Sequence, residues 1–347
     1  MPPNRRGDLN TPLLFCCAGV VVVKRLRGRK KERRQMLTIV QFPHGGNEFP
    51  CNDDNCLDRE KRMTKWNAGP HCRRLVKHRG MYVDKGGASA LADLAFWTEW
   101  EANTVVNELP SLLQVDRTAA RWVHTVVWPD PTYAQPKLTC RHLKQRRLGT
   151  QCSPAQVNAG TNTDPCVFGA TFKYCLCRQK AASRILKHLD NGSLIVFGST
   201  IEGVFYLDTV FVVNMRKEYE TTPESIAKIK VSDEYKNLTL NRFIGFNGAF
   251  YRGATMSHKV NGMFSFTPAM LLHGDDHSFR RRCALNVAEI NKLNGERMMF
   301  NPCSTQSIKS TEIDTQPGLV KDVWDEIRQQ VLDQGFVLGT RFAWPKK

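Results

Sequence analysis

Four acidic residues have the surroundings that an acid or base catalyst needs, namely large aromatic side chains and predicted loop or strand ends. Asp164 precedes a proline in a predicted tight loop, and Asp208 lies within a run of apolar residues. Glu99 and Glu101 alternate with tryptophans in the segment 96–101. During hydrolysis of an N-glycosidic bond, a carboxylate orients water or stabilises positive charge on the sugar. These four carboxylates are therefore the candidate catalytic residues.

Each of these carboxylates also has a structural interpretation. The side chain of Asp164 suits a cap that accepts backbone N–H bonds within its own loop, because aspartate commonly does so in turns. In a strand over 96–101, Trp97, Glu99 and Glu101 share one face. That face is then simply the solvated face of an ordinary strand. The sequence leaves both interpretations open.

Trp66 and two histidines interleave with basic side chains in the segment 66–79, and a second basic patch covers the segment 141–147. Arginine and lysine contact phosphates and aromatic rings stack on bases, so this mixture is typical of a nucleic-acid-binding surface. A solvated basic turn has a similar composition, and that alternative stays open. The candidate nucleic-acid-binding residues are His71, Arg73, Arg74, Lys77, Trp97, Arg141, His142, Lys144, Arg146, Arg147, Tyr174, Tyr251 and Arg252. Phosphate contacts are expected from Arg73, Arg74, Arg146 and Arg147.

The charge of the chain also favours a polyanionic partner. Its 347 residues carry a formal net charge of +17. Residues 1–35 hold ten Lys or Arg against two acidic residues, which gives +8 and leaves +9 for the rest. Such a surface favours DNA as the partner, because phosphates neutralise it. A basic protein without a nucleic-acid partner has the same charge.

Cysteines are numerous, but their spacing predicts neither disulfides nor a metal. The chain has 12 cysteines and no Cys-x-x-Cys pair. His44, Cys51 and Cys56 are possible zinc ligands without a matching second pair. Cys175 and Cys177 would share one face of a predicted strand. We therefore expect reduced thiols, a cytoplasmic protein, and no metal or cofactor.

The first 35 residues differ from the rest of the chain. An apolar run at 13–23 is too short to span a bilayer, and basic residues follow it instead of a cleavage site. This predicts a disordered or non-native leader, with Met36 as the natural start and no membrane partner. Residues 36–347 are expected to form one large α+β domain, in which the segment 136–215 carries the site.

Hydrophobic patterns predict a mixed, largely antiparallel sheet with flanking helices. Strands are expected at 37–42, 96–101, 119–128, 172–177, 194–198, 205–213 and 336–342. Helices are expected at 223–236 and 318–334, the second being the clearest because its apolar residues recur with the helical period. Polar loops between such strands are where binding and catalytic residues concentrate.

Several segments resemble one family. They are FPHGGNE at 42–48, WNAGPHCRR at 66–74, FWTEWE at 96–101, NTDPCVFG at 162–169, and GSLIVFGS at 192–199 with LDTVFVV at 207–213. These segments resemble uncharacterised bacterial proteins associated with nucleotide-modification and phage-defence loci. The resemblance spans roughly residues 36–342 and implies a function on modified DNA or nucleotides.

Three functions fit these observations. The first is a DNA glycosylase directed at modified bases in defence against phage. The second is an ADP-ribosyl or nucleotide transferase using Tyr251 and Arg252, because the segment 251–265 resembles two motifs of that class, although its Glu-x-Glu motif is not evident. The third is a non-catalytic module that binds modified nucleic acid. Dinucleotide-binding, P-loop, zinc-protease and zinc-deaminase signatures are absent from the sequence.

Overall fold

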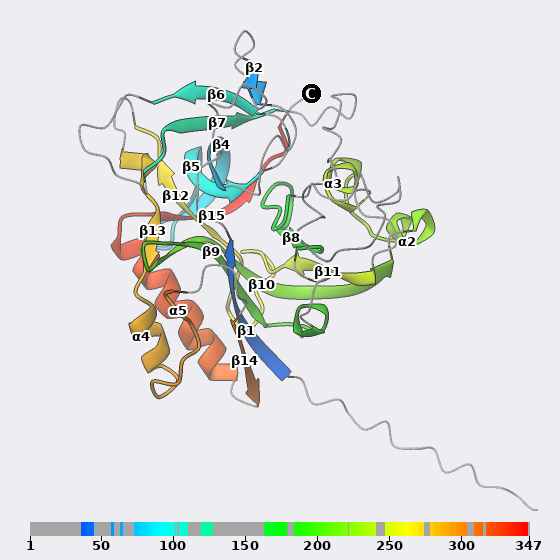
Figure 1. The fold of residues 1–347 in the computed structure, drawn as a ribbon, viewed down its shortest axis with the longest axis vertical. Coiled ribbons are helices and arrows are strands. Elements are labelled where there is room, and N and C mark those ends of the chain that lie inside the picture. The colour runs from blue at the N-terminus through cyan, green and yellow to red at the C-terminus, as the bar shows by residue number, and fades with distance from the viewer. Residues whose placement is uncertain are drawn as a thin grey trace, which may run out of the picture. The chain divides into compact units, whose positions relative to one another are not determined.

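Two mixed β-sheets carry most of the fold (Figure 1). The first sheet has the strand order β14-β1-β9-β10-β11-β8, and β13 also pairs with β10. The second has the order β15-β12-β5-β4-β7-β6-β3-β2. Among the described strands, only β1 with β9 and β4 with β7 pair in parallel. The expected α+β class and the largely antiparallel pairing are confirmed, but there are two sheets where we expected one.

The computed structural model describes residues 36–44, 57–58, 63–64, 73–100, 102, 104–109, 119–127, 163–177, 179, 184–220, 222–240, 247–273, 278–303, 309–314 and 317–345. Contacts group the described residues into one compact unit. The expectations for the leader therefore fall outside the described residues.

The strands of both sheets have the following bounds. The first sheet contains β1 (Met36–His44), β8 (Lys173–Tyr174), β9 (Leu194–Ile201), β10 (Val204–Glu220), β11 (Asn247–Gly253), β13 (Cys283–Leu285) and β14 (Lys309–Asp314). The second contains β2 (Leu57–Asp58), β3 (Met63–Thr64), β4 (Arg73–Val83), β5 (Ser89–Glu99), β6 (Thr104–Glu108), β7 (Trp122–Val126), β12 (Thr267–Leu271) and β15 (Val337–Phe342).

Four strands of the second sheet pair in a closed ring. The strand β15 pairs with both β12 and β4, while β5 pairs with β12 and β4. The buried ring of Phe342 stacks on Phe96, with ring centroids 4.0 Å apart. Gly80 and Gly339 make room for that ring, because a Cβ at either position would lie 2.6 Å from Phe342. The closure fixes the positions of β4 and β5, which carry charged residues of the site described below.

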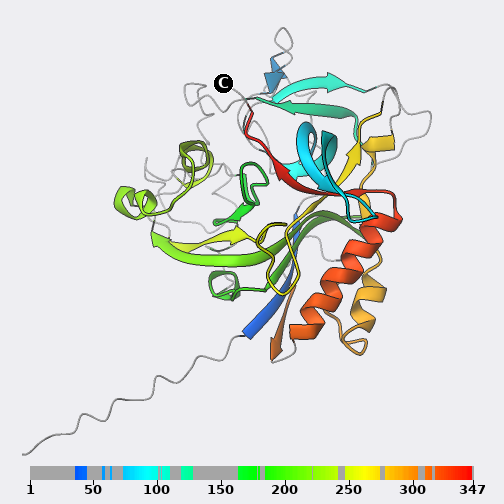
Figure 2. The same cartoon turned by 180° about the vertical axis from the view of Figure 1, so that it is seen from behind.

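The helix α5 (Pro317–Asp333) forms where the sequence predicts it. Its apolar side is buried against the first sheet through Val320, Val323 and Ile327, and the indole N–H of Trp324 donates to the Phe264 carbonyl over 2.9 Å. The helix α4 (Val287–Lys292) lies beside it (Figure 2). Among the described residues, no helix is long and apolar enough to cross a membrane.

The single helix expected at 223–236 is wrong. The chain forms two short helices instead, α2 (Pro223–Ala227) and α3 (Asp233–Leu238). Between them, the carbonyls of Lys228 and Lys230 accept bonds from the side chains of Lys217 and Arg252. The break therefore comes from tertiary contacts with β10 and β11. Two one-turn 3-10 helices, η2 (Arg184–Lys187) and η4 (Ser278–Arg280), complete the described elements.

Candidate functional site

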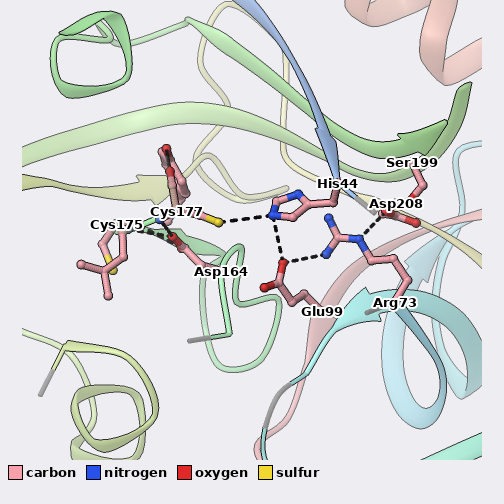
Figure 3. A network of polar contacts seen from close by, with 10 residues as sticks. His44, Arg73, Glu99, Asp164, Cys175, Cys177, Ser199 and Asp208 are labelled. Atoms are coloured by element: carbon pink, nitrogen blue, oxygen red, sulfur yellow. Dashed lines mark hydrogen bonds and ion pairs between the residues drawn. The ribbon is translucent and has the colours of Figure 1, made fainter. Parts of the chain in front are cut away.

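A buried group of charged and polar side chains joins the two sheets (Figure 3). The first sheet contributes side chains from β1, β9 and β10, and the second contributes side chains from β4 and β5. A turn after β8 and the residue before β13 add one side chain each. We call this group the polar cluster, and its members are His44, Arg73, Glu99, Cys177, Ser199, Asp208 and Arg282.

Arg73 is the central cation of the polar cluster. It lies directly opposite Glu99 in the antiparallel β4–β5 pair, and its Nη1 is 2.9 Å from Glu99 Oε2. Its Nε is 2.8 Å from Asp208 Oδ2 on the first sheet. Burial alone would lower the pKa of Arg73, but the charges of Asp208 and Glu99 raise it above its ordinary value. Arg73 therefore stays charged and ties two buried carboxylates, one from each sheet.

Asp208 reaches the cluster because β10 is irregular at this point. The register between β9 and β10 shifts between Leu207 and Thr209, and such a bulge redirects the side chain that it contains. Ser199 Oγ donates to Asp208 Oδ2 over 3.4 Å, and Arg282 Nη1 lies 3.9 Å from Oδ1. Burial raises the pKa of Asp208 despite the opposing effect of the two arginines.

His44 brings a titratable ring to Glu99. It ends β1, its ring stacks on Phe42 with centroids 4.7 Å apart, and its side chain is only 10% exposed. Its Nε2 lies 3.2 Å from Cys177 Sγ and 3.5 Å from Glu99 Oε2. The nitrogen, the sulfur and a carboxylate oxygen all lie within 4.8 Å of one another. In Figure 3, dashed lines join the carboxylate of Glu99 to both His44 and Arg73.

Cys177 is held in place by Asp164. Asp164 Oδ1 accepts the Cys175 N–H over 2.9 Å, and Oδ2 accepts the N–H groups of Leu176 and Cys177 over 2.7 Å each. These bonds fold the chain into a turn directly after β8. Burial raises the pKa of Asp164 to about 7, although the three backbone donors act in the opposite direction.

The strand expected over 172–177, with both thiols on one face, is therefore wrong. Only Lys173 and Tyr174 are in a strand, and the turn then sends the two thiols to different neighbours. Cys175 Sγ lies 3.1 Å from the hydroxyl of Tyr235, whereas Cys177 Sγ faces His44. Backbone bonding to a distant carboxylate overrides the alternating pattern here.

The four candidate carboxylates do not all lie in the same site. Glu99 and Asp208 come together through Arg73. Asp164 lies next to the cluster but accepts backbone N–H bonds, as in the capping interpretation, except that the donors are residues 175–177 and not its own loop. Glu101 lies outside the described residues.

Several candidate nucleic-acid-binding residues are buried, which corrects the sequence interpretation. Arg73 is 1% exposed and Arg74 is 2% exposed, and Arg74 Nη1 donates to the Ala102 carbonyl over 2.8 Å. Neither arginine lies on a surface where a phosphate backbone would meet it. The guanidinium of Arg282 covers the ring of Trp97 at 3.6 Å, so this ring does not offer that face to a base.

The two candidate tyrosines are also internal. Tyr174 and Tyr251 are fully buried and stack on each other with centroids 5.8 Å apart. The hydroxyl of Tyr174 donates to the Cys177 carbonyl over 2.7 Å, and that of Tyr251 donates to the Leu186 carbonyl over 2.8 Å. Both tyrosines pack the core, so base stacking and a transferase role for Tyr251 do not fit this structure.

The remaining candidates are exposed, engaged elsewhere or outside the described residues. Lys77 is exposed on β4. Arg252 is half-buried and donates to the Lys230 carbonyl. The residues outside the described ranges are Cys51, Cys56, His71, Arg141, His142, Lys144, Arg146 and Arg147.

Sequence reasoning missed how the cluster is assembled. His44 appeared only as a possible zinc ligand with different partners, and Cys177 only as one of a pair of thiols. The two are 133 residues apart, so no local spacing reveals their contact. Ser199 and Arg282 carried no signal. The pattern Trp97-x-Glu99 was informative, because strand alternation does place Glu99 at the cluster.

Comparison with known proteins gives no relative. No family model matches the chain, and no characterised protein or solved structure is measurably similar to it. The function is therefore inferred from the chemistry of the polar cluster. An imidazole, a carboxylate and a thiol within 4.8 Å of one another are able to activate water, exchange protons or hold a metal ion.

Proposed function

We propose that this protein is an enzyme that hydrolyses the N-glycosidic bond of a modified base in DNA, with the polar cluster as its reaction centre. The supporting observation is the convergence of His44, Glu99 and Cys177 within 4.8 Å, with Glu99 buried and the other two side chains partly buried. Burying charged groups costs more than packing apolar side chains of the same volume. Clusters of buried titratable groups are therefore concentrated at functional sites.

The proposed reaction forms one bond and breaks one bond at C1′ of the sugar. A water oxygen bonds to C1′ of the sugar while the bond from C1′ to the base nitrogen breaks. The base nitrogen keeps the electron pair of that bond and takes up one proton, and the sugar keeps a hydroxyl group. Glu99 is the carboxylate that we assign to this centre in place of Asp164, because Asp164 is engaged with three backbone donors.

The choice of DNA as substrate rests on charge and resemblance. The net charge of +17 favours a polyanion. The resemblance of several segments to uncharacterised bacterial proteins associated with nucleotide-modification and phage-defence loci favours a modified base. A cytoplasmic location fits this substrate, and the five cysteines within the described residues are free thiols, as a reducing compartment requires.

Abasic-site formation tests the proposal. The purified full chain is incubated with normal and hypermodified phage DNA, and abasic sites and released bases are quantified by mass spectrometry. The Glu99→Gln variant should lose about 100-fold or more of the rate, because a carboxylate that exchanges protons has been removed. Asp322→Asn, an exposed change on α5, is the matched control and should keep full activity.

Other outcomes would select other functions. Binding of modified DNA without any covalent product would favour the non-catalytic module. Consumption of NAD with transfer to DNA would favour the transferase, despite the buried position of Tyr251. Equal rates in Glu99→Gln and Asp322→Asn would remove the polar cluster from the reaction.

A further inference from the structure

We infer that His44, Glu99 and Cys177 form a binding site for a divalent metal ion of the zinc class. The sequence led us to expect no metal, because His44 had no matching partners nearby in the chain. The fold supplies those partners from β5 and from the turn after β8. Within the described part of the chain, no other three His, Cys, Asp or Glu side chains converge in this way.

Two of the three distances between the donor atoms are close to those of tetrahedral coordination, and the third is at most 4.8 Å. Bonds of about 2.0–2.3 Å from zinc to nitrogen, oxygen and sulfur separate neighbouring ligand atoms by about 3.3–3.6 Å. His44 Nε2 lies 3.2 Å from the sulfur of Cys177 and 3.5 Å from Glu99 Oε2. Nitrogen, oxygen and thiolate together are typical zinc donors. Three protein ligands leave the fourth position for water, as in catalytic zinc sites.

A thiol–imidazole pair for nucleophilic catalysis explains this geometry less well. In such triads the acid contacts the ring nitrogen opposite the one that faces the nucleophile. Here Glu99 and Cys177 both approach Nε2 of His44. Convergence of all three donors on one side of the ring is what coordination of a common ion requires.

The surroundings of the three donors hold them in position. Arg73 binds Glu99, Asp164 binds the backbone N–H of Cys177, and Phe42 stacks on the His44 ring. Such outer contacts commonly orient metal ligands. Arg73 does not exclude a metal, because a carboxylate has about four lone-pair sites on its two oxygens. One can face the guanidinium while another faces the ion.

This inference does not depend on the proposed reaction, since metal binding is measured without DNA. If both hold, His44, Glu99 and Cys177 would hold the ion, and the ion would help to activate water, because a bound divalent ion lowers the pKa of water. The two claims fail separately. A metal-binding protein that makes no abasic sites overturns only the reaction, and a metal-free active enzyme overturns only the metal site.

Cobalt substitution tests the site. The full chain, purified without a histidine tag, is stripped with a chelator and titrated with Co²⁺, and zinc uptake is measured in parallel by elemental analysis. We expect about one ion per chain, with the intense visible bands of tetrahedral cobalt and a near-ultraviolet thiolate band. Cys177→Ser should lose the thiolate band, whereas the exposed Cys303→Ser should keep it.

A second variant tests the site independently, in case Cys177→Ser does not fold. His44→Gln leaves the thiol in place and should lower the affinity for cobalt at least 10-fold, because loss of a contact that only orients a ligand already costs about 10- to 100-fold. Circular dichroism shows whether each variant is folded. Absence of stoichiometric cobalt from the wild-type protein would overturn the inference. An unchanged thiolate band in folded Cys177→Ser would do the same, because the ion would then lie on other cysteines.

Discussion

Glu99 and Asp164 are both buried carboxylates, yet their partners are of different kinds. Asp164 receives three backbone N–H bonds from consecutive residues of one turn. Glu99 meets a guanidinium and an imidazole from two other strands, and the thiol of Cys177 lies beside them. Backbone donors neither gain nor lose protons, whereas imidazoles and thiols do. The first carboxylate therefore shapes the chain, and the second belongs to a group that is able to do chemistry.

Asp164 also helps to position the groups around Glu99. The turn that Asp164 organises presents Cys177 to His44, and His44 in turn contacts Glu99. A sequence interpretation that ranks acidic residues by their aromatic neighbours does not separate these roles. What separates them is the identity of the hydrogen-bond donors.

The largest effect is expected from removal of Arg73. Arg73→Met leaves Glu99 and Asp208 buried without their shared cation, and breaking a buried ion pair in this way costs about 3–5 kcal/mol. The free energy of unfolding, measured by denaturant titration, should fall by this amount. Arg79→Met on the same strand is the matched control, because the Arg79 side chain is exposed. Equal stability of the two variants would show that the cluster is not an essential ionic link between the sheets.

A smaller loss of stability is expected from Asp164→Asn. The amide offers one acceptor oxygen in place of two, so at least one buried backbone N–H loses its partner, at a cost of about 1–3 kcal/mol. Turnover per folded molecule should fall much less than in Glu99→Gln. Melting and turnover are measured on the same samples, with Asp322→Asn as control. Lost turnover at an unchanged melting temperature would restore Asp164 as a catalytic residue.

Local patterns predicted the parts of the fold that local physics determines. The helix α5 and the strand β10 follow from hydrophobic periodicity over long segments. The break between α2 and α3 and the turn at Cys177 were missed, because side chains from distant strands and loops bind their backbones. The division into two sheets was missed because it is set by pairings between strands far apart in the chain, such as β1 with β14 in the first sheet and β12 with β5 in the second.

The site was predictable only in part for the same reason. Strand alternation identified Glu99, and the apolar run around Asp208 marked a carboxylate in the core. Nothing local shows that Arg73 faces inward, since an arginine in a basic segment is ordinarily solvated. Its burial follows from the two carboxylates that it meets, and one of them lies on the other sheet.

The smallest expected effect is on the pH dependence of stability. It comes from a buried histidine that contacts neither Glu99 nor Asp164. His124 on β7 is buried and lies 2.8 Å from the Thr104 hydroxyl. Burial, and then the charge of Arg74, lower the pKa of His124 well below 6.5. The folded state therefore binds fewer protons than the unfolded state. The contribution of neutral His124 to the free energy of unfolding is fully present above pH 6.5. It is lost as the pH falls towards the pKa of His124 in the folded state.

Replacing that histidine should remove this part of the pH dependence. Between pH 7.5 and 5.5 the wild-type protein should lose about 1 kcal/mol through His124, whereas His124→Gln should lack this loss. Denaturant unfolding at the two pH values measures the difference. His258→Gln, on an exposed loop, is the control and should keep the wild-type dependence. If His124→Gln shows the same loss of unfolding free energy as the wild-type protein, the acid sensitivity comes from other groups. Burial of one imidazole would then have no measurable effect on stability in this protein.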